Sequence, residues 1–382
     1  MARIQLAFKV SAPGKVILHG EHSVVYGKPA VAGAVGARNS LIFREQSHDS
    51  IDLDYTSISV QHKFAVLEVN KVLEQFSGNE NNLDSSDKIE SFFKCLIPDN
   101  LTDQGRKGLT STLYLLCGIL SQNKIKSIST GFSIKITSEL SVGAGLGSSA
   151  SFGVCLSAAF ITYSKCRSVG DLSLDLSPED KNTISNWAFE SEKIMHGTPS
   201  GVDNTVCTFG SIVKFTKLKP IEHVDIKRKI NILLVDSKVS RSTIKLVKQV
   251  AELKQEFPSI VDHMLSAMEE VANHAADLYA SDSVDSNCSF EKLKKLFQIN
   301  NDLLKGIGVS HPKLENIFSI ALANGYSSKI TGAGGGGYAL ILLPDSYKEM
   351  ESFKTLCSDL ENAGFSYLET NVGGPGVVVE RV

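Results

Sequence analysis

The sequence predicts a mixed fold of the α/β or α+β class, because strand-like and helix-like segments alternate along the chain. Residues 132–136 place apolar side chains at every second position, which is typical of a strand. Residues 178–196 carry apolar side chains at helical spacing. A glycine-rich segment, residues 143–150, joins the strand pattern to a long apolar helix. We find no fixed-period repeat, so mixed strands and helices around packed cores are expected.

The composition is that of an ordinary globular protein. The chain has 382 residues, of which 42% are hydrophobic and 21% are charged. This length suggests two or three domains, and it is enough to bury a large core without disulfides or metals. The net charge is −3 and no Lys/Arg block dominates any stretch. We therefore expect neither a nucleic-acid partner nor a membrane partner.

The cysteines and the chain ends predict a cytoplasmic location. Seven cysteines are scattered without a C-x-x-C pair, which indicates reduced thiols, and Cys155 lies in an apolar run typical of a core. Residues 1–10 lack the apolar run of a signal peptide, and the last four residues carry no targeting address. No stretch reaches the roughly 18 apolar residues of a membrane helix.

The first part of the chain predicts two short strands, 8–11 and 16–18, with a turn at Pro13-Gly14 between them. Further on, the polar segment 77–104 reads as a surface excursion, to which we assign no function.

A helix is predicted from Ser177-Pro178 to His196. A capping serine, a proline at the first helical position and acids in the first turn mark its start, and Gly197 marks its end. Glu192 lies at the edge of the apolar stripe of this helix, half-facing the core.

We place a domain boundary at residue 228, which divides the chain into 1–228 and 229–382. Lys219-Pro220 and a charged segment interrupt the apolar pattern just before this point. The elements predicted beyond it are a strand at 232–235, helices at 242–280 with a break at Pro258, at 289–305 and at 312–324, and strands at 328–331 and 338–343.

The glycine-rich segment is the strongest functional signal. Glycines let the backbone approach a ligand closely, and the helix that follows offers free N–H groups and a positive dipole end. Together these features favour a phosphate site, to which the serine hydroxyls add phosphate or Mg²⁺ contacts. The alternative is a purely structural turn. The predicted cofactor-binding residues are Gly143, Ala144, Gly145, Leu146, Gly147, Ser148, Ser149 and Ala150.

Other glycine motifs do not fit this segment. It lacks the G-K-[S/T] of a Walker A loop and the G-x-G-x-x-G spacing and distal acid of a dinucleotide fold. Neither serine lies in the G-x-S-x-G of a hydrolase elbow.

A second glycine loop covers residues 332–337, where five of six residues are glycine. So dense a run disfavours regular structure, which indicates that the bare backbone is needed. It either closes over a nucleotide, or supports the first glycine loop, or serves as a flexible hinge.

Several charged residues are candidates for chemistry, although each has an ordinary structural interpretation when taken alone. Lys15 follows a Pro-Gly pair and could neutralise a phosphate, or be a surface lysine. Asp203 could serve a function or satisfy local backbone N–H groups in its turn. Glu192 near an apolar face needs a partner, for which a metal would serve. Glu21 and His22 could bind an anionic or hydroxylated substrate, or cap a turn.

Three stretches, residues 12–15, 145–150 and 331–337, together resemble the GHMP kinase superfamily of small-molecule kinases. Within it, the segments 11–22 and 196–204, with Leu368-Glu369-Thr370 ahead of Gly373-Gly374-Pro375-Gly376, resemble the mevalonate kinase family. The resemblance extends from residue 8 to residue 379.

The resemblance implies a two-domain α+β fold with an N-terminal domain like ribosomal protein S5 domain 2 and a ferredoxin-like C-terminal domain. It implies ATP-dependent, Mg²⁺-assisted phosphorylation of the C5 hydroxyl of (R)-mevalonate, an early step of isoprenoid and sterol precursor synthesis. It also implies a homodimer and inhibition by isoprenoid diphosphates.

The resemblance implies a role for each matching residue. Asp203 resembles the catalytic aspartate and Lys15 the lysine that stabilises the reacting hydroxyl. Glu192, with Ser149 or Ser148, resembles the Mg²⁺ ligands. The implied substrate-side residues are Glu21, His22 and Thr243, and the implied supporting loop is Gly332, Ala333, Gly334 and Gly335.

Two other functions stay open at this point. The chain could be another GHMP kinase, such as a galactokinase or a phosphomevalonate kinase, which a substrate panel separates. It could instead be a ligand sensor of the same fold without catalysis. The complete set of Lys15, Ser149, Glu192 and Asp203 argues against the sensor.

Overall fold

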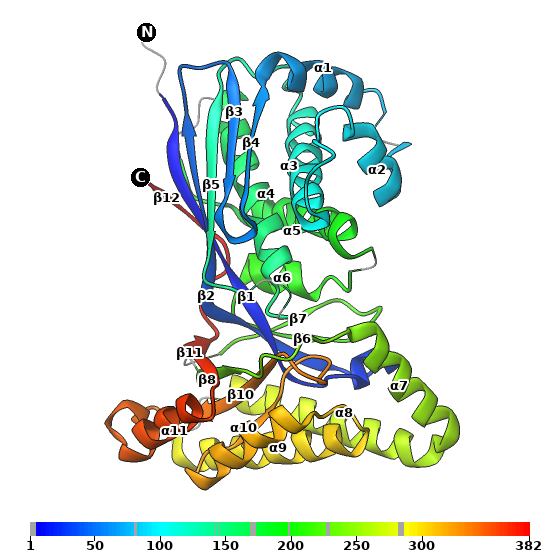
Figure 1. The fold of residues 1–382 in the computed structure, drawn as a ribbon, viewed down its shortest axis with the longest axis vertical. Helices are drawn as coiled ribbons and strands as arrows, with labels where there is room; N and C mark the ends of the chain where they lie inside the picture. The colour runs from blue at the N-terminus through cyan, green and yellow to red at the C-terminus, as the bar shows by residue number, and fades with distance from the viewer. Residues whose placement is uncertain are drawn as a thin grey trace.

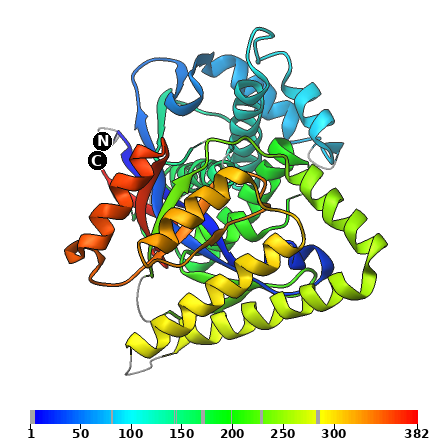
Figure 2. The same cartoon turned by 60° about the horizontal axis from the view of Figure 1, so that its bottom comes forward.

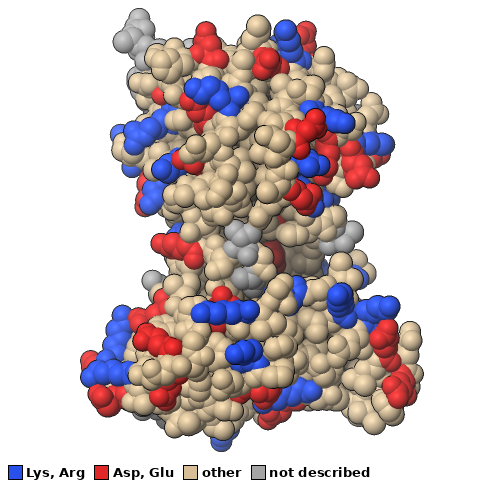
Figure 3. Space-filling model, in the orientation of Figure 1, with Lys and Arg blue, Asp and Glu red and all other residues tan. Residues whose placement is uncertain are grey.

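The chain folds into two lobes that are joined by long strands (Figure 1). We call the lobe with α1 to α6 the N-lobe and the lobe with α7 to α11 the C-lobe. The surface narrows between them (Figure 3), and on the face shown there acidic and basic side chains are interspersed. The computed structural model describes residues 5–79, 82–141, 143, 145–168, 173–197, 199–226, 230–281 and 286–382.

The N-lobe is a sheet covered by helices. Strands β4, β3, β5 and β2 are neighbours in that order, β1 pairs with β2, and only the β3–β5 pairing is parallel among these. The strands are β1 (Ala7–His19), β2 (Ala30–Glu45), β3 (Ser50–Tyr55), β4 (Val60–Ala65), β5 (Phe132–Ser138), β6 (Ile212–Phe215) and β7 (Glu222–Val224). The helices are α1 (Val66–Phe76), α2 (Ser86–Phe93), α3 (Asp103–Gln122), α4 (Ser148–Ser168), α5 (Pro178–His196) and α6 (Val202–Phe209), with short 3₁₀ turns η1 (Ser23–Tyr26) and η2 (Thr56–Ile58).

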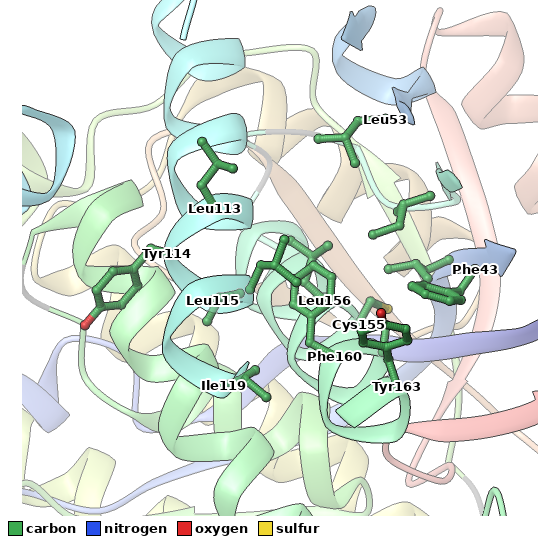
Figure 4. Close-up of a cluster of buried hydrophobic side chains, with 14 of the residues drawn as sticks. Phe43, Leu53, Leu113, Tyr114, Leu115, Ile119, Cys155, Leu156, Phe160 and Tyr163 are labelled. Carbon is green, nitrogen blue, oxygen red and sulfur yellow. The ribbon is translucent and has the colours of Figure 1, made fainter. Parts of the chain in front are cut away.

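The N-lobe core lies between this sheet and helices α3 and α4. Figure 4 shows Leu113 and Ile119 of α3 and Leu156 and Phe160 of α4 pointing into one apolar cluster. Cys155 is fully buried there, as the sequence predicts. Because α4 is apolar on all sides, it packs at the centre of the lobe, and its first turn is thereby held rigidly in place.

The predicted turn at Pro13-Gly14 is wrong. Residues 7–19 form one long strand, β1, whose pairing with β2 shifts register between Pro13 and Lys15. The irregularity takes up the proline, which has no N–H to donate. A Cβ on Gly14 would lie 2.6 Å from the carbonyl oxygen of Leu146. Glycine is therefore needed here for close approach to the glycine-rich segment 143–150, which we call the first glycine loop, and not for a turn.

Helix α5 confirms the predicted bounds. The Ser177 side chain accepts from the Asp180 N–H, and the Asp180 carboxylate accepts from the Ser177 N–H, which completes a capping box. Residues 77–104, expected as a surface excursion, include α2, whose Ile89 and Phe93 are buried against the N-lobe core.

The C-lobe has helices on both faces of its strands. Alternate residues of β8 enter two separate cores: Leu233 and Val235 face one, and Ile232 and Leu234 face the other. The elements are β8 (Ile230–Asp236), α7 (Thr243–Glu256), α8 (Pro258–Ala280), α9 (Ser286–Gly306), α10 (Pro312–Ala323), β9 (Ser328–Ile330), β10 (Tyr338–Leu343), η4 (Tyr347–Glu349), α11 (Glu351–Asn362) and β11 (Ser366–Val372). The elements from β8 to β10 match the predicted order, including the break at Pro258, whereas η4, α11 and β11 were not predicted.

The two lobes share strands. β11 meets β2 at Val372 and Val35, and the last strand, β12 (Val378–Arg381), returns to pair with β1. The predicted boundary at residue 228 falls within 227–229, which lie outside the described residues. None of the helices that the structure describes has the length and apolar character needed to cross a bilayer.

Candidate active site

A cavity of about 310 Å³ lies where the lobes meet. Helices α4, α5 and α6 of the N-lobe present polar side chains to it, and Arg241 and Thr243 enter from the C-lobe segment after β8. The described residues that line the cavity are Asn39, Tyr55, Ser57, Ile58, Gln104, Gly108, Ile136, Gly143, Gly145, Gly147, Ser148, Ser149, Phe152, Glu192, Met195, His196, Asp203, Arg241 and Thr243.

The first glycine loop forms one wall of this cavity. Gly143, Gly145 and Gly147 have φ values of 74°, 80° and 72°, which side-chain-bearing residues rarely adopt. The loop ends at Ser148, the first residue of α4, whose opening N–H groups have no partners within the helix. This arrangement is suited to phosphate. The predicted residue Ala144 lies outside the described part of the chain.

Lys15 and Asp203 meet in an ion pair of 3.1 Å between Nζ and Oδ1. The Lys15 side chain is 9% exposed and that of Asp203 is 31% exposed. The backbone N–H of Lys15 donates to the Leu146 carbonyl at 2.8 Å, which ties β1 to the first glycine loop. Asp203 lies in the first turn of α6, where the helix dipole favours a negative charge. A hydroxyl brought to this pair would meet an acceptor and a cation together.

Glu192 lies beside this pair and is almost fully buried. Its Oε1 is buried without a hydrogen-bond partner. Burial, reinforced by the nearby charge of Asp203, raises the pKa of Glu192 to about 7, against a hydrogen bond from Ser149 and the charge of Lys15, which act the other way. A buried carboxylate oxygen without a partner is poised for a cation or a proton.

A divalent cation would need ligands from outside the chain. Among the residues that the structure describes, no group of three or more His, Cys, Asp and Glu side chains could hold a metal. Mg²⁺ is commonly bound by one or two carboxylates together with substrate phosphates. Glu192, a serine at the start of α4 and nucleotide phosphates fit that pattern.

His196 is a cavity residue that the sequence pointed to only as a helix end. It is the last residue of α5, as predicted, but its Nε2 lies 2.9 Å from the Ser149 hydroxyl. Burial lowers the pKa of His196, which favours the neutral ring as a partner for Ser149. Ser149 therefore makes a side-chain contact within the cavity, and its partner His196 lies one helical turn after Glu192 on α5.

Part of the cavity lining is apolar. Tyr55 and Ile58 come from the end of β3 and the turn after it, Ile136 comes from β5, and Phe152 and Met195 come from α4 and α5. Flat aromatic and aliphatic walls suit a nucleotide base, while the glycine loop suits its phosphates. Sequence reasoning missed this wall because its residues come from five separate elements and match ordinary core positions.

Arg241 lies between the two glycine loops. Its Nη1 donates to the Thr331 carbonyl at 3.0 Å, and a Cβ on Gly145 would lie 1.7 Å from its Nη2. Burial lowers the pKa of this guanidinium. The second glycine loop therefore contacts the first through Arg241, which favours the predicted supporting role.

The second glycine loop is also packed by its own backbone, unlike a free hinge. The Gly335 N–H donates to the Val309 carbonyl at 2.8 Å, and the Gly337 N–H donates to the Val239 carbonyl at 3.0 Å. A Cβ on Gly334 would lie 2.1 Å from the Val309 oxygen. Its glycines are thus required by close packing as much as by any ligand.

The three predicted substrate-side residues do not lie together. Thr243 lines the cavity at the first residue of α7. His22 is buried, with Nε2 2.8 Å from the Ala333 carbonyl of the second glycine loop. The Glu21 carboxylate is fully buried in an ion pair with Lys329 and is not among the described residues that line the cavity.

Comparison with known proteins shows the family of the chain. The GHMP kinases N terminal domain matches residues 114–211, and the GHMP kinases C terminal domain matches residues 287–367. The mevalonate kinase of Homo sapiens is 33% identical over 380 residues, which cover 97% of this chain and 94% of the human protein.

Solved structures show the same fold. The Methanococcus jannaschii mevalonate kinase superposes with a TM-score of 0.72 at 22% identity, covering 98% of this chain and 100% of its own. The L. major mevalonate kinase, solved in complex with R-mevalonate, superposes with a TM-score of 0.69 at 20% identity, covering 98% of each chain. The fold is therefore the two-domain α+β GHMP kinase fold, and the chain belongs to the mevalonate kinase family.

Proposed function

We propose that this protein transfers the γ-phosphoryl group of ATP to the C5 hydroxyl of (R)-mevalonate, forming 5-phosphomevalonate. The observation that carries the proposal is the Lys15–Asp203 pair, which faces the same cavity as the first glycine loop. Sequence identity of 33% to the human mevalonate kinase over nearly the full chain supports the choice of substrate. The L. major relative binds R-mevalonate within the same fold.

The chain's own residues divide the work of the reaction. Phosphoryl transfer depends on in-line positioning and on neutralising charge, with little covalent work for the protein. The first glycine loop and the start of α4 hold the phosphates. Asp203 accepts the proton of the C5 hydroxyl, and the Lys15 ammonium at its side stabilises the developing alkoxide. The second glycine loop supports this geometry through Arg241.

Mg²⁺ fits the residues present. The buried Oε1 of Glu192 without a partner and the Ser149 hydroxyl nearby are oxygen ligands of the kind that Mg²⁺ prefers. When bound with ATP, the ion would neutralise charge on the phosphate oxygens. We assign Glu192 and Ser149 as its protein ligands, and His196 as the group that orients Ser149.

Glu192→Gln is expected to stabilise the nucleotide-free protein at pH 8 while removing activity. The folded-state pKa of about 7 lies above the ordinary value of 4.5, so the folded protein binds this proton more tightly than the unfolded chain does. Stability therefore falls as the pH rises from about 4.5 to about 7, by about 3 kcal/mol in all, and Gln avoids that loss.

Thermal unfolding of both proteins at pH 5 and pH 8 measures this effect. We expect a higher Tm for Glu192→Gln at pH 8, a much smaller gain at pH 5, and a kcat at least about 100-fold lower with MgATP. Glu190→Gln is the matched control, because Glu190 lies on the same helix in a surface pair with Lys193. Full activity of Glu192→Gln would contradict the metal assignment.

A substrate panel tests the function itself. ADP release by purified protein with MgATP should require (R)-mevalonate, and galactose and phosphomevalonate should not replace it. Turnover with galactose or phosphomevalonate instead would leave the proposed mechanism unchanged and would assign a different substrate. ATP binding without turnover on any substrate would favour the sensor function.

Further properties expected from the sequence and from the resemblance are also part of this proposal. We propose the division into domains 1–228 and 229–382, a homodimer, a cytoplasmic location and a place early in isoprenoid and sterol precursor synthesis. We also propose inhibition by isoprenoid diphosphates that compete with ATP. Absence of inhibition by farnesyl diphosphate at concentrations that compete with ATP would remove that last point, and light scattering measures the mass of the assembly.

A further inference from the structure

The turn that follows β1, residues 20–22, has a strained backbone close to the active site. His22 adopts φ 61° and ψ −45°, which a residue other than glycine rarely does. Such a conformation persists only where surrounding contacts hold it. His22 Nε2 lies 2.8 Å from the Ala333 carbonyl oxygen. Burial lowers the pKa of His22, and the positive charge of the cavity residue Arg241 lowers it further. The turn is thus connected to the cavity through the second glycine loop.

Glu21, one residue earlier, is held by two C-lobe residues. Its Oε1 is in an ion pair with Lys329 Nζ, and both side chains are 0% exposed. Its Oε2 accepts a hydrogen bond from Asn300 Nδ2 at 3.0 Å. Lys329 also donates to the Ile330 carbonyl. Both lobes therefore meet at one buried carboxylate that the phosphoryl-transfer mechanism does not use.

The segment after Lys329 also contacts β1. The Thr331 hydroxyl donates to the Ile17 carbonyl at 2.8 Å, and within the C-lobe the Ile330 N–H donates to Asn301 Oδ1 at 3.1 Å. Tyr26 of η1 packs against the C-lobe core, and the blue segment after β1 reaches the C-lobe helices in Figure 2. Residues 19–26 are thus anchored in the C-lobe, although they belong to the N-terminal part of the chain.

A buried ion pair is a poor source of net stability. Taking two charges out of water costs about as much as their attraction returns, and apolar residues of similar size often serve as well. A fully buried pair next to a strained residue is better explained by the geometry that it enforces.

Resting on the proposed function, we propose that Lys329, together with Asn300, is a positioning residue for phosphoryl transfer. By fixing the Glu21 carboxylate, it holds His22 and, through the Ala333 carbonyl, the second glycine loop, which packs against the cavity residue Arg241. Glu21 thus acts through His22 and does not touch mevalonate, in contrast to the role that the sequence resemblance implies for it.

Lys329→Met removes the cation and keeps most of the side-chain volume. We expect kcat/KM for mevalonate to fall about 10- to 100-fold, because misplacing reacting groups by about 1 Å costs this much. The KM for ATP should stay within about twofold, because the phosphate loop lies on the N-lobe. Rates are measured at a temperature where circular dichroism shows the variant to be folded.

Two further variants separate positioning from stability. Glu21→Gln keeps hydrogen-bonding atoms for Asn300, and Lys329 can then lose its proton, so a smaller loss in the same direction is expected. Glu21→Gln/Lys329→Met contains neither buried charge, so its Tm should recover while its kcat/KM for mevalonate stays low. If Lys329→Met does not fold, Glu21→Gln and the double variant test the proposal in its place.

The matched control is Glu45→Gln, which breaks the buried Glu45–Arg167 ion pair of the N-lobe. It should lower Tm and leave both KM values and kcat unchanged. Wild-type kcat/KM in folded Lys329→Met, or recovery of kcat/KM together with Tm in the double variant, would overturn the proposal. If the wild-type protein does not phosphorylate mevalonate at all, the proposed function fails first, and the two failures are thereby distinguished.

Discussion

Asp203→Asn is expected to lower kcat by about 1,000-fold or more, since general-base assistance contributes up to about 10⁴-fold and the developing charge loses its partner. Asparagine matches aspartate in shape, so the cavity keeps its form. It cannot accept the proton of the C5 hydroxyl, and it leaves the Lys15 ammonium without the carboxylate that lies 3.1 Å away. Steady-state kinetics with mevalonate and MgATP measure the loss.

The binding of ATP should change little in Asp203→Asn, because the glycine loop and the apolar wall are intact. A nucleotide-displacement titration should give a Kd for ATP within about threefold of wild type. Asp180→Asn is the matched control: Asp180 pairs with Lys165 at 2.8 Å and caps α5, and it does not line the cavity. Asp180→Asn should lower Tm and leave kcat unchanged. Near-normal turnover of folded Asp203→Asn would show that the base assignment is wrong.

Lys15→Met is expected to lower kcat by about 100- to 1,000-fold, which is typical when one preorganised electrostatic contact to a developing oxyanion is removed. The Lys15 side chain is 9% exposed, so little water reaches its ammonium, and the charge acts at close range. Gly147 lies against this side chain, and a Cβ added at Gly147 would lie 2.8 Å from Lys15 Cγ.

Lys15→Arg distinguishes charge from placement. It keeps the positive charge, but the planar guanidinium does not fit a channel shaped for an ammonium, so we expect only partial recovery of kcat. Lys28→Met, which breaks the Lys28–Glu269 pair outside the cavity, is the control and should keep kcat. A folded Lys15→Met with turnover within about threefold of wild type would contradict the electrostatic role.

Local patterns predicted the parts of the site that depend on local chemistry. The start and end of α5 were predictable because a capping serine, a first-turn proline and a terminal glycine each act within a few residues. The first glycine loop was predictable because positive φ at alternate positions requires glycine.

The parts that the sequence did not predict depend on contacts between distant segments. Pro13-Gly14 has the composition of a turn, but pairing with β2 and the approach of Leu146 keep it in a strand. Nothing near Glu21 indicates that its partner is Lys329, 308 residues further along the chain. The position of Arg241 between two glycine loops likewise follows only from the packing of the lobes.

The most direct test of the central claim is the identity of the product. Wild-type protein is incubated with MgATP and (R)-mevalonate, and the mixture is examined by phosphorus and proton NMR. We predict one new phosphomonoester coupled to the C5 methylene protons, formed with one ADP per product and absent from the Asp203→Asn reaction. A phosphorylated C3 hydroxyl, ATP hydrolysis without a mevalonate product, or the same product at the same rate from Asp203→Asn would contradict the account.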